Sequence, residues 1–310
     1  MSRRLQELML AAVKSLQNPI DYIRTRAHGD LTTTADGVRG IVKAETGADA
    51  DGARIAAAAA RGGAERSPVD ASAPLRGRTD AGEEITFSAD RARTATMYDS
   101  DGNILGLRVL STQPGVDDAV EGEYLRTWAR SDRLADTEYS PAVRRQLPIR
   151  GAKTIWEWGH SRAAAWGAAV RRNGTPPIYV DAHAGLHGYG ADVDIGTAEN
   201  RVWKKVVVDG EAFGRIVGSH PDFHRAITTG PQRPVVVLSC NSSRPGATGA
   251  QEFATYMHGE GGVVSDIHVP TGIAKPEVLP GTDIAALALE QTTDEAGRLL
   301  PAVRTFHAPQ

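Results

Sequence analysis

The sequence has one cysteine and few aromatic residues. A single cysteine among 310 residues cannot form a disulfide within the chain, which favours a reducing compartment or a fold that needs no oxidation. No run approaches the roughly 18 consecutive apolar residues of a membrane-spanning helix, so we expect no stable membrane insertion. The first residues lack the apolar core of a signal peptide, which predicts a soluble, cytoplasmic protein.

A strong excess of either charge is also missing. The formal net charge is −3, so the chain has no overall basic field that would attract nucleic acid or an anionic membrane. We therefore expect no nucleic-acid partner. The length is sufficient for one large domain or two ordinary ones, and either would bury a substantial core.

The composition changes along the chain. Apolar residues recur at steps of three and four over residues 2–17, which predicts an amphipathic helix that packs on the protein or docks a partner. Residues 32–78 are rich in Ala and Gly and predict weakly packed helices, then a linker over residues 67–77. We therefore predict an N-terminal helical region and linker over residues 1–80, and a second domain over residues 81–310 with its core in residues 150–275.

Local patterns predict both helices and strands in the second domain. Turn residues 99–103 between two apolar runs predict a β-hairpin over residues 94–110. Apolar periodicity predicts helices over residues 121–134, 154–172, 213–227 and 249–258, and strands over residues 84–87 and 202–208. This mixture indicates an α/β fold.

Two apolar, β-branched runs end in side chains capable of covalent chemistry. Residues 177–183 end in His183, and residues 234–240 end in Cys240. Such runs, bounded by Pro and turn residues, predict buried strands of a parallel sheet, and ligands gather at the carboxyl ends of those strands. The segment between them is long enough for a strand–helix crossover, which would make the two strands parallel neighbours.

A thiol beside an imidazole is the arrangement that nucleophilic catalysis by cysteine requires. A free cysteine has a pKa of about 8.5, so it needs a nearby base or a positive dipole to react at neutral pH. Asn241, Ser242 and Ser243 predict a turn whose exposed N–H groups would stabilise an oxyanion. An inert buried thiol is the alternative for Cys240, but the histidine at the end of the other strand favours catalysis.

These residues resemble the caspase/gingipain-type cysteine peptidases (clan CD), which share the caspase-haemoglobinase fold. Within that group they look most like the CHAT-like and "lonely Cys" peptidase domains of large bacterial multidomain proteins. The resemblance covers residues 177–272, is carried by residues 179–183, 237–240 and 269–272, and extends weakly back to residues 97–110.

The resemblance implies a three-layer caspase-like sandwich with a mostly parallel sheet flanked by helices. It implies a cysteine endopeptidase that forms a thioester acyl-enzyme on Cys240, with His183 as general acid/base. A protein or peptide is then the substrate, and no cofactor is needed. The oxyanion site would combine the backbone N–H of Cys240 with that of the glycine after the histidine.

The chain departs from the family pattern at the His-Gly pair. Ala184 stands between His183 and Gly185, whereas His187 is followed directly by Gly188. Both histidines are candidates for the base; we favour His183, because it directly follows the apolar run, with Ala184 or Gly185 supplying the oxyanion N–H. The broken pair also supports an inactive pseudo-peptidase that binds or scaffolds. A third hypothesis is a protease effector or toxin delivered to a target cell.

Charged residues near the pair suggest two kinds of substrate pocket. Asp181, Asp192 and Asp194 would bind a basic side chain, whereas Arg244 in the loop after Cys240 would bind an acidic one. We favour the acidic pocket, although both sets would also fit a solvated surface.

We expect no metal site. The pairs His183/His187 and His220/His224 have the spacing of helical zinc ligands, but the first lies in a glycine-rich loop and the second contains a proline. The turn at residues 99–103 resembles a calcium loop only faintly, since its glycine comes one position early and no glutamate follows where one is required.

Overall fold

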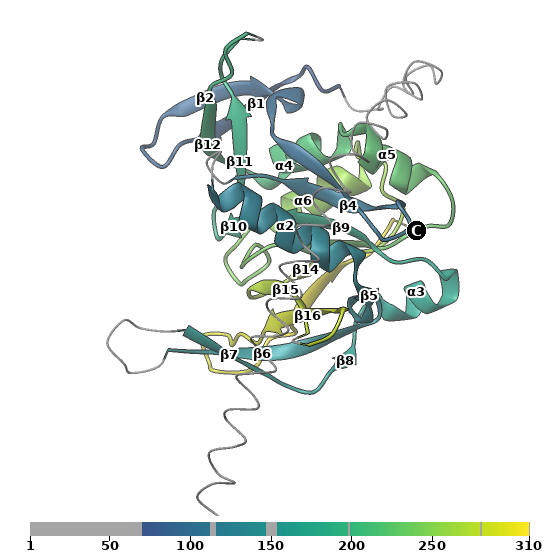
Figure 1. Ribbon diagram of the computed structural model, residues 1–310. Coiled ribbons are helices and arrows are strands. Elements are labelled where there is room, and N and C mark those ends of the chain that lie inside the picture. Colours follow the sequence, from purple (N-terminus) through teal and green to yellow (C-terminus); the bar gives the residue numbers. More distant parts are fainter. Residues whose placement is uncertain (1–69, 112–115, 147–153, 198, 280, 310) are drawn as a thin grey trace, which may run out of the picture. The chain divides into compact units, whose positions relative to one another are not determined.

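The computed structural model describes residues 70–111, 116–146, 154–197, 199–279 and 281–309 (Figure 1). The chain divides into two units, Met1–Glu65 and Arg66–Gln310, and the described residues belong to the second. The predicted helix over residues 2–17 and the Ala/Gly-rich region up to residue 69 lie outside the described residues.

The described part is a mixed α/β structure, as predicted. Its strands are β1 (Pro74–Arg78), β2 (Glu84–Ser88), β3 (Thr94–Tyr98), β4 (Ile104–Val109), β5 (Asp132–Arg133), β6 (Glu138–Gln146), β7 (Thr154–Trp158), β8 (Arg162–Ala163), β9 (Ile178–Ala182), β10 (Ala184–Gly185), β11 (Gly188–Asp194), β12 (Trp203–Val208), β13 (Val235–Leu238), β14 (Ile267–Pro270), β15 (Ala274–Val278), β16 (Ile284–Glu290) and β17 (Val303–Phe306). The helices are α2 (Val116–Arg130), α3 (Gly167–Asn173), α4 (Gly210–Gly218), α5 (Pro221–Thr228) and α6 (Gly249–His258), with short 3₁₀ turns η1 (Ala89–Arg91) and η2 (Leu134–Asp136).

The central sheet has the strand order β17-β14-β13-β9-β4-β3. Its four inner strands are parallel, and the edge strands β3 and β17 are antiparallel to their neighbours. The prediction that the histidine strand and the cysteine strand are parallel neighbours is confirmed, because β9 pairs with β13. The predicted hairpin is also confirmed as β3 and β4.

Both faces of the central sheet are buried, which explains why its strands are almost continuously apolar. On one face, Ile178, Val180, Val235 and Val237 pack in a core with aromatic residues of α4, α5 and α6. On the other face, alternate residues of the same strands pack with α2, α3 and β16; they include Tyr179, Val236 and Leu238. Helices and further strands therefore cover the sheet on both sides (Figure 1).

Two further sheets were not predicted. One is antiparallel, in the order β10-β11-β12-β1-β2, and the other has the order β15-β16-β6-β7. Residues 184–194, which we interpreted as a glycine-rich loop, form the β10–β11 hairpin instead. Residues 74–78 form β1, so the predicted linker is wrong there, and a boundary at residue 80 would cut the β1–β2 hairpin.

The helix predicted over residues 154–172 is wrong in its first half. Thr154–Trp158 is strand β7, paired with β6, and the helix α3 begins only at Gly167. Alternating tryptophans suit a strand as well as a helix, because aromatic side chains pack readily on a pleated surface. The predicted end at Asn173-Gly174 is confirmed, with Gly174 in the left-handed conformation at φ 67°.

Candidate functional site

The parallel pairing of β9 and β13 brings Cys240 and His183 to one edge of the central sheet. Leu238 is in register with Asp181, and Cys240 and His183 each lie two positions farther along. Side chains alternate along a strand, so both residues continue the face that carries Tyr179 and Leu238. Both line one cavity of about 260 Å³.

Several elements form this cavity, and Arg108 of β4 also lines it. The ends of β9 and β13 contribute one wall, α2 contributes Tyr124 and Leu125, and β15 contributes residues 274–277. The Tyr124 hydroxyl donates a hydrogen bond to the Pro276 carbonyl, which connects α2 to β15 across the cavity. A strand edge suits Pro276, because proline has no N–H to donate.

The thiol of Cys240 is partly buried, and this burial raises its pKa. The Ala274 N–H donates a hydrogen bond to the sulfur and opposes the rise, whereas the charges of Asp181 and Glu290 add to it. The resting side chain is therefore a neutral thiol at physiological pH. A preformed thiolate would require the opposite balance of charges.

A fixed turn follows the cysteine. Asn241 has φ 59°, a left-handed conformation that is uncommon for residues other than glycine. Its N–H donates to the Gly272 carbonyl at 3.0 Å, and the Ser243 hydroxyl bonds the carbonyls of Val269 and Pro270 at 3.0 and 2.8 Å. Asparagine adopts this conformation more readily than most residues, and these bonds hold the turn in place.

The structure places the two candidate histidines differently. His183 lines the cavity with Cys240, and its carbonyl accepts a hydrogen bond from the Gly190 N–H at 2.8 Å. His187 lies in the two-residue turn of the β10–β11 hairpin, is exposed, and is not among the residues that line the cavity. His183, and not His187, therefore shares a cavity with Cys240.

The hydrogen-bond pattern of the β10–β11 hairpin decides whether Ala184 or Gly185 has an N–H that could bind an oxyanion. His183 and Gly190 are a hydrogen-bonded pair, and pairs alternate along an antiparallel ladder. The next pair, Ala184 and Tyr189, is therefore not hydrogen-bonded, and the Ala184 N–H points away from β11. The Cys240 N–H makes no hydrogen bond to another residue that the structure describes. These two N–H groups are the candidate oxyanion donors.

Only Asp181 among the four charged candidates reaches the cavity. Its carboxylate lies 3.3 Å from the guanidinium of Arg108, a largely buried residue that also lines the cavity. Arg244 is exposed on the loop after Cys240 and does not line the cavity. Glu277 lines it as well, paired with Lys275 at 3.2 Å. No sequence signal identified Glu277, Lys275 or Tyr124, because they come from segments remote from both motifs.

The other two aspartates have structural partners. Asp192 is 1% exposed and lies 3.2 Å from Arg93; burial raises its pKa to about 6 despite that charge. Asp194 accepts N–H bonds from Gly196 and Val202 at 2.9 and 3.0 Å, and these bonds help to lower its pKa. Both carboxylates are therefore engaged in holding β11 and are closed to a substrate side chain.

The remaining histidine and aspartate patterns have local roles. His220 is the N-cap of α5, where its Nδ1 accepts from the Asp222 N–H at 3.3 Å. The Asp99 carboxylate accepts the N–H groups of Asp101 and Asn103, which closes the β3–β4 turn. Over the described ranges, no three His, Cys, Asp or Glu side chains are grouped closely enough to hold a metal ion. Nor is any helix there long and apolar enough to cross a membrane.

Comparison with known proteins adds no relative. No family model matches this chain, and neither the curated proteins nor the solved structures give a match. An argument about function therefore has to start from the site, because a fold alone does not specify an activity.

Proposed function

We propose that this chain is a cysteine peptidase with a three-layer, caspase-like arrangement, in which Cys240 is the nucleophile and His183 the general acid/base. One observation carries the proposal: two adjacent parallel strands, in register, deliver the thiol and the imidazole into the same cavity. Active sites of open α/β sheets lie at this carboxyl edge.

The chemistry follows the usual course of acyl transfer. His183 takes the proton from Cys240 as the sulfur attacks the scissile carbonyl carbon, and the resulting oxyanion accepts bonds from the Cys240 and Ala184 N–H groups. His183 then gives the proton to the departing amine, which leaves a thioester. Water, deprotonated by His183, attacks the thioester carbonyl, and Cys240 leaves as the thiol, with its proton restored.

The raised pKa of Cys240 decides how the attack begins. A neutral thiol must lose its proton during the attack, so His183 acts as a general base. The resting site does not hold a thiolate paired with a protonated imidazole. The thiol should therefore react sluggishly with a small alkylating agent at neutral pH, and the reaction should accelerate only above the usual pKa of a thiol.

The charges of the cavity favour a substrate with a basic side chain. Asp181 raises the pKa of Cys240, and Glu277 and Asp181, after burial, raise the pKa of the Tyr124 hydroxyl. Two separate groups therefore respond to these carboxylates, although Arg108 and Lys275, which line the same cavity, partly balance the negative charge. A lysine or arginine side chain in the cavity would be attracted to it, and its charge would also ease formation of the thiolate.

Labelling with a thiol-reactive peptide probe that ends in arginine tests the proposal. We expect rapid labelling of the wild type, none of Cys240→Ala, and labelling slower by about a hundredfold or more for His183→Ala. His187→Ala is the matched control, because this histidine is also exposed and follows soon after. A matching probe that ends in aspartate should react more slowly.

Two outcomes would count against the proposal. If His183→Ala and His187→Ala label equally fast, His183 has no role in catalysis. Labelling that persists in Cys240→Ala would show that the probe reacts elsewhere.

A second candidate is an inactive pseudo-peptidase that binds peptides in the same cavity. The half-buried, neutral Cys240 favours it, because a thiol whose pKa is raised mainly by burial is also typical of an inert cysteine. In that case the arginine peptide would bind without any covalent product, and binding would survive Cys240→Ala.

A further inference from the structure

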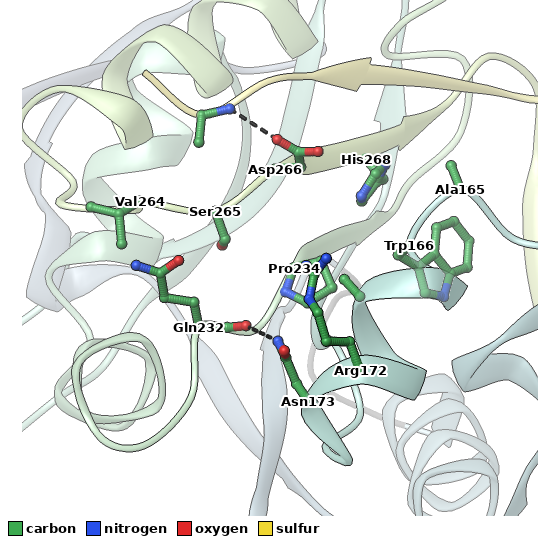
Figure 2. A pocket seen from close by; sticks show the side chains of 12 residues that line it. Ala165, Trp166, Arg172, Asn173, Gln232, Pro234, Val264, Ser265, Asp266 and His268 are labelled. Carbon is green, nitrogen blue, oxygen red and sulfur yellow. Dashed lines mark hydrogen bonds between the residues drawn. The ribbon is translucent and has the colours of Figure 1, made fainter. Parts of the chain in front are cut away.

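A second cavity lies at the opposite edge of the central sheet, where β13 and β14 begin (Figure 2). Its volume is about 500 Å³, and α3 forms one side. Pro234 directly precedes β13, and His268 lies at the start of β14. The cavity is therefore separated from Cys240 by the length of the inner strands, and it has no part in the chemistry proposed above.

His268 is a buried polar group with one free nitrogen in this cavity. Its side chain is 3% exposed, and burial lowers its pKa to about 4, so the ring is neutral at physiological pH. Nδ1 lies 3.0 Å from the Thr305 hydroxyl, and the ring centre lies 5.6 Å from that of Trp166. Nε2 makes no hydrogen bond to any residue that the structure describes. This nitrogen is open to the cavity, where it would form a hydrogen bond with water or with a ligand.

Arg172 supplies a positive charge. It lies in the last turn of α3 and lines the cavity together with Pro234 (Figure 2). Arg172 is exposed, and it has no ion-pair or hydrogen-bond partner among the described residues. The carboxylate that also lines the cavity, Asp266, is already engaged, since it accepts the Ala308 N–H at 3.0 Å and lies 3.3 Å from His307.

The wall between these groups is held in place before any ligand arrives. Asn173 donates a side-chain hydrogen bond to the Gln232 carbonyl, and Ser265 donates one to the Arg233 carbonyl at 2.6 Å. The Arg233 guanidinium in turn bonds the carbonyls of Pro176, Ile104 and Pro177 at 2.7, 2.9 and 3.0 Å. Binding would thus cost little further ordering of this wall.

We infer that this cavity binds a small organic anion, a carboxylate or phosphate monoester, through Arg172. The guanidinium pairs with the anionic group, since its fork of donors matches carboxylate and phosphate oxygens. His268 Nε2 makes one neutral hydrogen bond to the ligand, and Pro234, Val264 and the neighbouring alanines contact its apolar part. A cavity of about 500 Å³ is in the size range of sites for metabolites.

The test is a titration of the full chain with inorganic phosphate and, separately, with succinate, followed by amide and imidazole NMR. We expect saturable shifts for His268, Ser265 and Ala308 with at least one of the two anions. Arg172→Gln should weaken that binding about tenfold, the value of one charge-assisted contact. Arg171→Gln is the matched control, because it removes the neighbouring charge of α3 from a residue that does not line the cavity.

The two probes distinguish the source of the anionic group. Saturation by phosphate alone identifies a phosphate ester as the ligand class, and saturation by succinate alone identifies a carboxylate. The inference is overturned if neither anion saturates these signals at millimolar concentration, or if both arginine variants weaken binding equally. The readout does not depend on peptidase activity, so it separates this inference from the proposed function.

Discussion

At the scale of single residues, burial sets the protonation of the groups near the site. Cys240 and Asp192 both have a pKa raised first of all by burial, whereas Asp194, only two residues from Asp192, has a lowered pKa because backbone N–H groups bond it. The same residue type on the same strand therefore responds to pH in opposite directions.

Asp192→Asn should flatten the pH dependence of stability. The folded-state pKa of about 6 lies above the ordinary value of 3.8, so the neutral form stabilises the fold. This stabilisation is complete below about pH 4 and is lost as the pH rises through about 6. Urea denaturation of the wild type from pH 4 to 8 should show the loss, and the asparagine variant should lack it.

Asp194→Asn is the control, because the pKa of Asp194 is shifted in the opposite direction from that of Asp192. The lowered pKa of Asp194 means that its carboxylate stabilises the fold above the ordinary pKa, and that this contribution disappears as the pH falls. The variant's free energy of unfolding should therefore fall furthest below that of the wild type at neutral pH. An unchanged slope for Asp192→Asn would show that Asp192 does not titrate in this range.

At the scale of helices and strands, glycine sets how closely two elements approach. A Cβ on Gly106 of β4 would lie 1.9 Å from the Tyr179 carbonyl oxygen of β9, and one on Gly210 of α4 would lie 2.0 Å from the Gly249 carbonyl oxygen of α6. The second contact matters for the site, because α6 follows the turn after Cys240. Close packing of α4 against α6 therefore fixes the position of α6, the helix that follows this turn.

Two glycine-to-alanine substitutions should have opposite effects. Gly210→Ala should destabilise the protein by about 1–3 kcal/mol, because the added methyl overlaps the backbone of α6. Gly122→Ala in α2 should stabilise it by about 0.5–1 kcal/mol, since nothing lies within 4 Å of the added methyl and alanine favours a helix. Chemical denaturation measures both, and equal effects would contradict the packing of α4 on α6.

The sequence best predicted the strands that are buried on both faces. Residues 178–182 and 235–238 are buried on both faces, so their apolar runs indicated parallel strands without ambiguity. By contrast, β11 contains two glycines and two aspartates, a composition typical of a loop. It can be a buried strand because arginines remote in sequence pair with both aspartates. No local pattern contains that information.

The candidate site was predicted as far as its two motifs extend. Cys240 and His183 follow strands that the sequence identified, but the choice between His183 and His187 depended on a two-residue turn that was not foreseen. The far wall of the cavity comes from α2 and β15, and only tertiary packing brings these to the strand ends.

At the scale of the whole molecule, the part from Arg66 onward contains both cavities and the complete central sheet. The division of the chain falls after Glu65, ahead of β1, so no sheet is cut by it. The unit thus has its own core on each side of the central sheet.

A fragment of residues 66–310 should fold without the first unit. We expect one cooperative thermal transition, with a midpoint within a few degrees of that of the full chain, and the same probe labelling at Cys240. A fragment that starts at residue 81 is the control; it lacks β1 and should be clearly less stable, because the antiparallel sheet loses a strand between β2 and β12. Equal stability of the two fragments would contradict this.

Strand β13 has a consequence for how the two cavities communicate. Pro234, directly before the strand, lines one cavity, while Leu238 and Cys240 line the other. The strand between them is fully buried and hydrogen-bonded to a neighbouring strand on both sides. It is therefore rigid, and a displacement of one end should also displace the other end. Substitutions that shift β13 along its axis should therefore impair anion binding and thiol reactivity together.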